Sequence, residues 1–276
     1  MATANTAIPE VEPPQNESGP VHALGSAAID IYISARDLYS VFVRTLYYIF
    51  RGKRERGAVL KQMYEIGNKS LVFLCITMGF IGMILVYQSG LQARRVVPDY
   101  TALGATYMEL LVRDLAASIG ALMLATRVGA GIAAEVGSMV VTEQVDALRM
   151  SAADPIDFLI VPRFLASVIM TLMLITIAAL VAFWTGAATA YVAFDVRPDI
   201  FFNMRLIDAG DFITGFTKCI AYGAAIPIVS GYCGLSTFGG SEGVGWATTR
   251  AVVNSSLAII ILNFFISGAA FLIFPT

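Results

Sequence analysis

The sequence predicts an all-α integral membrane protein, in which an N-terminal amphipathic helix precedes five membrane-spanning helices and a cytoplasmic coupling helix. Hydrophobic residues make up 57% of the chain and charged residues 14%, whereas soluble domains carry roughly 25% charge. Five apolar stretches are each long enough to cross a hydrocarbon layer of about 30 Å. A net charge of −2 offers no basic excess for phosphate backbones, so we expect no nucleic-acid binding.

The first 70 residues divide into two segments by composition. Residues 1–26 are rich in Pro, Glu, Asn and Ser and predict a disordered cytoplasmic tail. Residues 27–70 predict an amphipathic helix followed by a basic linker, because polar residues recur at helical spacing and the run from Arg51 to Arg56 is basic. Aromatic side chains such as Tyr39 and Phe42 favour a helix at a membrane surface over one that packs in the core.

A transmembrane domain is predicted over residues 71–276. Its expected spans are residues 71–91, 107–134, 158–194, 212–238 and 251–274. The third is unusually long and has Pro162 near its start, so we expect part of it to lie along the interface or to tilt before it crosses.

The orientation follows from basic residues in short flanking segments. The segment before the first span holds eight of them: Arg36, Arg44, Arg51, Lys53, Arg54, Arg56, Lys61 and Lys69. Only Arg94 and Arg95 follow that span directly. We therefore expect a cytoplasmic N-terminus and, after five crossings, a C-terminus on the periplasmic side.

The segment between the second and third spans carries the most specific pattern. Gly129, Ala133 and Gly137 recur every four residues, which places small side chains on one helix face and lets another helix approach closely. A short amphipathic helix is expected over residues 142–151, with Thr142 as its N-cap and Asp154-Pro155 ending it. This helix is either a passive connector or a coupling helix that docks on an ATPase. The ATPase would be a separate protein, because the chain has no G-x-x-x-x-G-K-[ST] phosphate loop.

Several runs of residues together resemble the MlaE-type permease family. These runs are Ala-Ala-Glu135-Val-Gly-Ser-Met, Val-Thr142-Glu-Gln-Val-Asp146-Ala-Leu, Asp154-Pro155 and Val161-Pro-Arg163. The later Ala247-Thr-Thr-Arg250-Ala-Val-Val253 and the region of Ile81-Gly-Met83 and Gln88 also fit. The resemblance covers roughly residues 60 to 275.

The resemblance implies a membrane subunit of an ATP-binding-cassette system that moves phospholipid between the bacterial inner and outer membranes. It implies a homodimer, two copies of an ABC ATPase subunit, and a periplasmic MCE-domain ring, and it allows a small STAS-type regulatory subunit. The chain itself is then no enzyme and needs no cofactor, since ATP and magnesium bind to the ATPase. Lipid identity and transport direction stay open.

Charged residues near the outer end of the second span are the second candidate site. Glu109 and Arg113 are four residues apart and can pair along a helix; such a pair either stabilises a helix end or lines a cavity. The family has Arg-Glu-Leu-Gly-Pro here, whereas this chain reads Arg113-Asp114-Leu115-Ala116-Ala117. The loss of Gly-Pro predicts a regular helix at this point. We expect Lys218, early in the fourth span, to snorkel outward.

Two sets of residues are thus assigned. The expected lipid cavity comprises Tyr87, Gln88, Leu91, Leu110, Arg113, Asp114, Leu115 and Arg250. The expected ATPase-coupling residues are Glu135, Thr142, Glu143, Asp146, Leu148 and Arg149. An ion-coupled secondary transporter or channel for a hydrophobic solute is the alternative function, although acidic residues gather at span ends rather than forming a relay. A lipid-modifying enzyme is disfavoured because the spans contain no histidine and no nucleophile with a nearby base.

Overall fold

The computed structural model describes residues 20–51, 56–96, 103–202 and 206–274, all in helices and their connections with no strand among them. The chain forms two compact units, Met1–Ser40 and Val41–Thr276. Helix α1 (Pro20–Arg51) begins in the first unit and ends in the second. The disorder expected for residues 1–26 is wrong for residues 20–26, which are helical. Residues 1–19 and most of the basic run, residues 52–55, lie outside the described part.

Twelve further helical elements follow α1 in the described residues. They are α2 (Arg56–Val96), α3 (Leu103–Leu110), η1 (Leu111–Leu115), α4 (Ala116–Leu124), η2 (Ala125–Gly129), α5 (Ala130–Val141), α6 (Gln144–Met150), η3 (Ile156–Ile160), α7 (Val161–Phe194), α8 (Pro198–Phe201), α9 (Ala209–Leu235) and α10 (Gly240–Ile273). The three η elements are π-helical turns that continue directly into α-helices, so α3 to α5 form one helical segment.

Five helical segments are long and apolar enough to cross a membrane, which confirms the all-α membrane fold. They are Gly57–Arg95, Leu103–Val141, Ile156–Phe194, Ala209–Leu235 and Gly240–Ile273. Helix α2 has 41 residues, or about 60 Å at 1.5 Å per residue, so it extends well beyond the hydrocarbon. Residues 56–70, which we expected to form a linker, belong to this helix. The third span is also one continuous helical segment, Ile156–Phe194, in which the π-turn η3 runs directly into α7 and Pro162 lies at the junction of the two.

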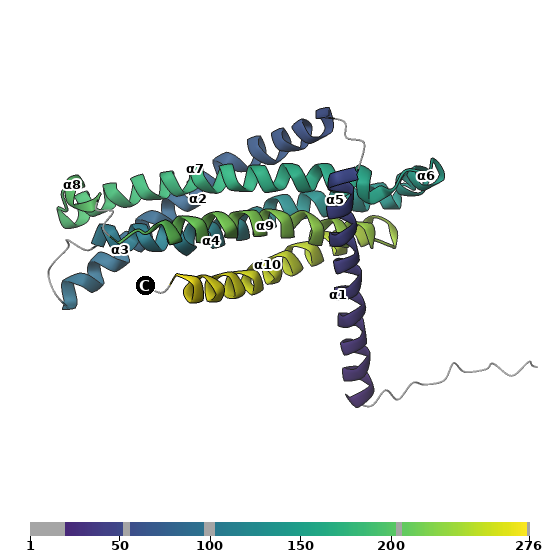
Figure 1. The fold of residues 1–276 in the computed structure, drawn as a ribbon, viewed down its shortest axis with the longest axis horizontal. Helices are drawn as coiled ribbons and strands as arrows, with labels where there is room; N and C mark the ends of the chain where they lie inside the picture. Colours follow the sequence, from purple (N-terminus) through teal and green to yellow (C-terminus); the bar gives the residue numbers. More distant parts are fainter. Residues whose placement is uncertain (1–19, 52–55, 97–102, 203–205, 275–276) are drawn as a thin grey trace, which may run out of the picture. The chain divides into compact units, whose positions relative to one another are not determined.

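The long helices of the second unit pack side by side (Figure 1). Helix α2 lies along α7, and α9 contacts α7, α5 and α10. Glycines allow the closest approaches: a Cβ on Gly82 would come within 2.3 Å of the Ala182 carbonyl oxygen. The small-residue face of α5 behaves as its spacing predicts, since a Cβ on Gly137 would come within 2.8 Å of the Thr237 side chain after α9.

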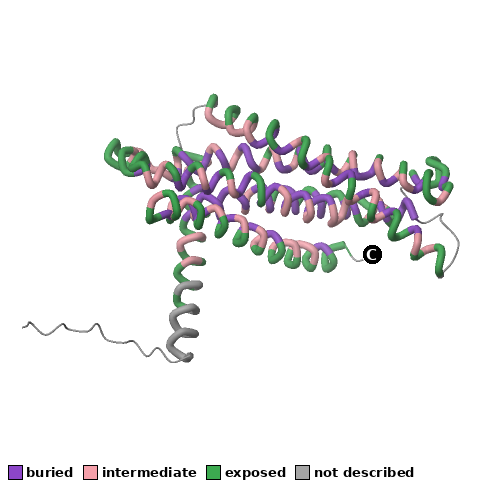
Figure 2. Tube along the Cα trace, turned by 180° about the vertical axis from the view of Figure 1, so that it is seen from behind, coloured by how far each residue is buried: buried purple, intermediate pink, exposed green. Residues whose placement is uncertain are grey.

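Helix α10 is the least buried of the spanning helices (Figure 2). The side chains of Phe264, Phe265 and Leu272 are 76%, 65% and 81% exposed. Apolar surface of this extent belongs against lipid or another protein chain.

The final turns of α1 belong to the second unit and contact the connection after α6. Arg44 forms an ion pair with Asp154, and the Tyr48 hydroxyl donates a hydrogen bond of 2.8 Å to the same carboxylate. On another face, Phe42, Leu46 and Phe50 recur every four residues and are exposed. This exposed apolar stripe is typical of a helix that lies in a membrane interface.

Candidate functional site

A charged site forms where η1 meets the beginning of α9. Arg113 Nη1 lies 4.0 Å from Glu109 Oε1, as their spacing predicts, and 3.7 Å from Asp211 Oδ1. The Asp211 carboxylate also accepts a hydrogen bond of 3.0 Å from the Asp208 amide, in a capping box that begins α9. The helix cap therefore holds the acidic partner of Arg113 in place.

The expectation of a regular helix around Asp114 is wrong. Residues Leu111–Leu115 form the π-turn η1 without the Gly-Pro pair of the family pattern. Gly215 explains how the irregular turn fits, because a Cβ there would lie 2.4 Å from the Val112 carbonyl oxygen. A close approach by α9, rather than a local helix breaker, accompanies the irregularity.

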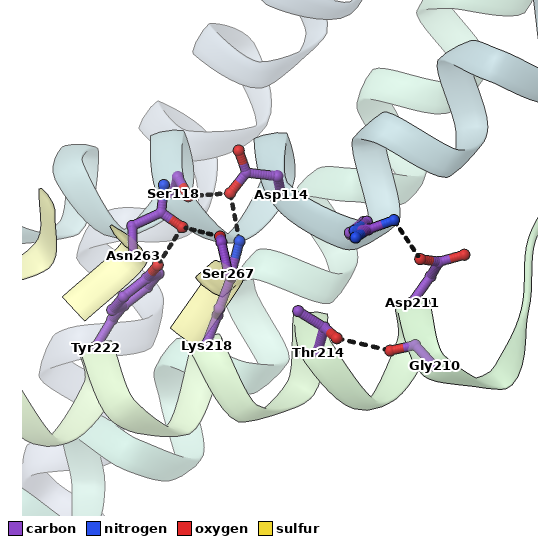
Figure 3. A network of polar contacts seen from close by, with 10 residues as sticks. Asp114, Ser118, Gly210, Asp211, Thr214, Lys218, Tyr222, Asn263 and Ser267 are labelled. Atoms are coloured by element: carbon purple, nitrogen blue, oxygen red, sulfur yellow. Dashed lines mark hydrogen bonds and ion pairs between the residues drawn. The ribbon is translucent and has the colours of Figure 1, made fainter. Parts of the chain in front are cut away.

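Lys218 does not snorkel outward: its side chain is 1% exposed. Its Nζ donates to Asp114 Oδ1 at 2.5 Å, and the Ser118 hydroxyl donates to the same oxygen at 2.9 Å (Figure 3). A charged partner on η1 makes burial of the ammonium favourable compared with leaving it unpaired.

A second set of hydrogen bonds adjoins this pair and involves α10. Asn263 Oδ1 accepts hydrogen bonds from the Tyr222 hydroxyl at 3.1 Å and from the Ser267 hydroxyl at 3.2 Å (Figure 3). Polar side chains of η1, α4, α9 and α10 thus meet within the spans. We call Asp114, Ser118, Lys218, Tyr222, Asn263 and Ser267 the polar network.

Two pockets of different character are lined by sequence neighbours of the polar network on η1 and α9. An apolar pocket of about 200 Å³ lies between α3 to α4, α7 and α9, and Leu111, Phe183 and Phe216 are among its lining residues. A polar pocket of about 290 Å³ is lined by Arg113 and Asp211 together with the end of α10. Apolar walls beside an accessible cation suit an amphipathic molecule with an anionic group.

The structure brings some expected cavity residues together and leaves others apart. Arg113, Asp114 and Leu115 lie on η1, and Leu110 precedes it with half of its side chain exposed. Tyr87 on α2 is 49% exposed and packs its ring 5.9 Å from that of Phe194.

Three further residues of the expected cavity lie elsewhere on the spans. Gln88 is exposed and Leu91 is half-buried on α2. Arg250 lines a pocket of about 480 Å³ at the connection from α9 to α10. It precedes Asn263 by 13 residues of α10, which corresponds to about 20 Å. Within one chain, Arg250 is therefore far from the polar network.

The expected coupling helix corresponds to α6, but Thr142 is not its N-cap. The Thr142 hydroxyl donates back to the Ser138 carbonyl oxygen at 2.8 Å and ends α5. Glu143 occupies the capping position with φ of 59° and makes no capping hydrogen bond. Val145 is buried and Leu148 is half-buried on one face. Helix α6 ends at Met150, before Asp154-Pro155, because a left-handed Ala152 follows it.

The outer face of α6 presents charge. Asp146 and Arg149 form an exposed ion pair at 3.0 Å, and Met150 is 86% exposed. An exposed charged face with an apolar side chain at its end is a surface that a protein partner can contact.

Glu135 connects α5 to the start of α7. Its Oε1 lies 2.8 Å from Nη2 of Arg163, whose side chain is 4% exposed. Arg163 Nη1 also donates to the Leu159 carbonyl oxygen at 2.6 Å, while its Nε has no hydrogen-bond partner. The sequence analysis named Arg163 only as part of a motif that resembles the family. Its position beside a span boundary, four residues after Leu159, was the signal that could have indicated a structural role.

Asp154 joins two elements, α1 and η3, next to α6. It accepts hydrogen bonds from the Ile156 amide and from Tyr48, and it pairs with Arg44. Burial raises the pKa of this carboxyl, but the Ile156 amide, Tyr48 and Arg44 together hold it below its usual value. The hydrogen bond that Tyr48 donates to Asp154 in turn raises the pKa of the Tyr48 hydroxyl. Asp154 therefore links the end of α1 to the beginning of the third span.

No group of metal-ligating side chains occurs among the described residues. Cys75, Cys219 and Cys233 are free thiols, and the latter two are buried.

Five spans, a polar network within them and a short amphipathic helix between the second and third spans define a membrane transport permease. Residues 59–269 match the family described as Permease MlaE. The chain belongs to the MlaE permease family.

Relatives agree with this membership. The chain is similar to a probable ABC transporter permease of Synechocystis, 38% identical over 81% of this chain and 86% of the relative. It is 32% identical to the intermembrane phospholipid transport system permease protein MlaE of Haemophilus influenzae, over 77% and 82% of the two chains. It is 34% identical to the chloroplastic protein TRIGALACTOSYLDIACYLGLYCEROL 1 of Arabidopsis thaliana, over 81% and 64%.

Membership in a permease family, together with the five apolar helices, makes the chain a multi-pass membrane transporter subunit. ABC permeases work with a separate ATPase, so the ABC transporter relatives imply an ATPase partner and a membrane context.

Proposed function

We propose that the chain is the permease subunit of an ATP-driven transporter that moves phospholipid between the bacterial inner membrane and a periplasmic MCE protein, toward or from the outer membrane. The observation that carries the proposal is the guanidinium of Arg113 in a polar pocket, while neighbouring residues of η1 and α9 line a separate apolar pocket within the spans. The names of the Haemophilus and Arabidopsis relatives, which refer to phospholipid and to a glycerolipid, support a lipid cargo.

The chemistry of the site suits a lipid. Arg113 offers donors for a phosphate group, while Leu111 and Phe216 offer apolar surface for acyl chains. Asp211 and Glu109 hold the guanidinium toward the polar pocket. In the assembled transporter, the exposed faces carrying Tyr87, Gln88, Leu91 and Leu110 extend this cavity, and Arg250 lines it from the other end.

Transport is driven through α6. ATP and magnesium bind to the ATPase, which contacts Glu143, Asp146 and Arg149 on the exposed face of α6. A push on α6 reaches α5 directly and α7 through the ion pair between Glu135 and Arg163. Both helices contact α9, which carries Lys218, so the cavity changes shape with the ATPase cycle.

The proposed assembly is a homodimer with two ATPase subunits below it, an MCE-domain ring above it and, in some states, a small STAS-type subunit. The bare apolar face of α10 supports a second protomer. The basic residues before the first span support a cytoplasmic N-terminus and a periplasmic C-terminus.

An ion-coupled carrier is the second candidate, and the ion pair between Lys218 and Asp114 favours it, because ionisable pairs within membranes serve such carriers. The two candidates differ in their source of energy, which is ATP hydrolysis for the first and an ion gradient for the second.

Purification of the tagged chain from its native membrane, followed by mass spectrometry of proteins and lipids, tests the proposal. We expect an ATPase, an MCE protein and an enriched phospholipid class. In proteoliposomes of the purified assembly, lipid transfer is expected to require ATP, and Arg113→Ala to lower it at least about tenfold; Arg197→Ala, an exposed cation outside the pockets, is the control. A chain that purifies alone with bulk lipid, or transfer driven by an ion gradient, contradicts the proposal.

A further inference from the structure

A polar cleft lies at the end of the spans that carries α6, between α2 and the segment η2 to α5. Its volume is about 330 Å³, within the range of small-ligand sites. Its lining residues recur at helical spacing on one face of each helix: Gln62, Glu65, Ile66, Lys69 and Ser70 on α2, and Arg127, Val128, Gly131, Ile132 and Glu135 on the other.

The cleft lies at a membrane boundary. On α2 the apolar run begins at Leu71, directly after Ser70. On the other wall, Arg127 and Glu135 lie in the last part of the second span, which ends at Val141 shortly before α6. Both walls therefore carry charged residues near the α6 end of the spans, where lipid headgroups lie.

The charges of this cleft are mostly uncommitted. Glu65 and Lys69 are four residues apart in the order that favours pairing, yet neither they nor Arg127 form any of the ion pairs found among the described residues. Glu135 pairs with Arg163 but keeps its side chain 44% exposed. Lys69, Arg127 and Glu65 thus face the cleft without an ion-pair partner among the described residues, and Glu135 faces it while it pairs with Arg163.

We propose that this cleft binds the headgroup of a zwitterionic phospholipid that carries a primary amine, in the leaflet on the α6 side. Lys69 and Arg127 bind the phosphate, and Glu65 and Glu135 bind the ammonium group. An anionic ligand would satisfy only the cations and leave the two carboxylates facing its charge, so a ligand with both charges fits best.

The acyl chains have a path along α2. Phe73 and Ile76 follow Lys69 by four and seven residues, so they continue its face of the helix into the apolar run. Their side chains are 42% and 55% exposed, which leaves apolar surface free for lipid.

This site is separate from the one that contains Arg113. Arg127 follows Asp114 by 13 residues of one helical segment, or about 20 Å. Binding here does not depend on transport, so its test stands apart from the test of the proposed function. Glu135 also pairs with Arg163, so a ligand bound in the cleft would affect the ion pair that links α5 to α7.

Photocrosslinking of the full-length protein in detergent tests the proposal. The probe is a phosphatidylethanolamine with a diazirine in one acyl chain, and labelled peptides are located by mass spectrometry. We expect label around Phe73 and Ile76, reduced about tenfold in the double variant Lys69→Ala/Arg127→Ala. Lys61→Ala is the matched control, because Lys61 is an exposed cation of α2 outside the cleft, and it is expected to keep full labelling.

The same experiment separates the headgroups. A phosphatidylglycerol probe, which lacks the amine, is expected to label the protein at least about threefold less than the phosphatidylethanolamine probe. In the variant Glu65→Gln, the difference in labelling between the two probes is expected to be smaller. Equal labelling of the double variant overturns the site, and equal labelling by both probes overturns the role of the carboxylates. Competition by excess inorganic phosphate overturns the lipid and assigns the cleft to free phosphate. Unchanged elution on gel filtration shows that the variants fold.

Discussion

The two charged regions of the spans differ in how far their charges are paired. In the polar network, Lys218 is almost fully buried and its ammonium is bound by Asp114. In the cleft at the α6 end, Lys69 and Arg127 are exposed and have no ion-pair partner among the described residues. A paired, buried charge acts on the protein itself, by fixing helices to one another. An unpaired charge at a boundary is available to a ligand. Substitution of Asp114 or Lys218 should therefore affect stability, and substitution of Lys69 or Arg127 should affect binding.

The largest expected effect is that of Asp114→Ala. It leaves the Lys218 ammonium buried without its partner, and breaking a buried pair in this way costs about 3 kcal/mol. Unfolding of the detergent-solubilised protein measures the change. The double variant Asp114→Asn/Lys218→Met removes both charges and should recover most of the loss; simple addition of two losses would contradict the pairing.

The next largest effect is expected for Glu135→Ala, which should lower the free energy of unfolding by about 2 kcal/mol. The reason is that Arg163 is buried and already has one unpaired nitrogen. Glu135→Gln keeps an acceptor and should cost less. The comparison is made by thermal unfolding and by the ATPase activity of the assembled transporter. A loss of ATPase stimulation with unchanged stability would assign Glu135 to coupling alone.

The variant Gly215→Ala tests whether the close approach of α9 to the π-turn η1 contributes to stability. The added Cβ would approach the Val112 carbonyl oxygen, so α9 must move away from η1 at a cost of about 1 to 2 kcal/mol. Gly245→Ala on α10 is the control, since a Cβ there meets nothing within 4 Å. Equal melting temperatures for the two variants would show that the close approach is not required.

The smallest effect is expected at Asp154, where the partner Arg44 is half exposed. Its carboxyl has a lowered pKa in the folded protein, so its contribution is present above about pH 4, the unfolded pKa, and is lost as the pH falls through the folded pKa. Asp154→Asn should lower stability by at most about 1 kcal/mol at pH 7. The difference in Tm from wild type should shrink below about pH 4, and a difference independent of pH would contradict the pairing.

The sequence was sufficient for the class of fold because five apolar runs of spanning length admit few other structures. It underestimated the helices at their ends: residues 56–70 are polar enough to suggest a linker, yet helical spacing of Ile66 and Ser70 already placed buried side chains on one face. Hydropathy reports what a segment can be buried in, and it says little about where its helix stops.

The site was predicted only in part, because its key partners are distant in sequence. Glu109 and Arg113 pair within one helix, so local spacing was enough to find them. Lys218 pairs with a residue 104 positions away, and no local pattern reveals such a contact. A signal was present nonetheless: Asp211 and Lys218 are seven residues apart on one face of α9, with signs complementary to Arg113 and Asp114.

The π-turns η1 and η2 also determine how substitutions along residues 103–141 should be read. Each π-turn adds one residue to a turn, which rotates everything beyond it by about 100° relative to an uninterrupted α-helix. A helical wheel drawn from Leu103 therefore assigns the wrong face to residues after Leu115 and is wrong by two positions after Gly129. Cysteine accessibility scans of this segment need three separate wheels, one for each α-helical piece.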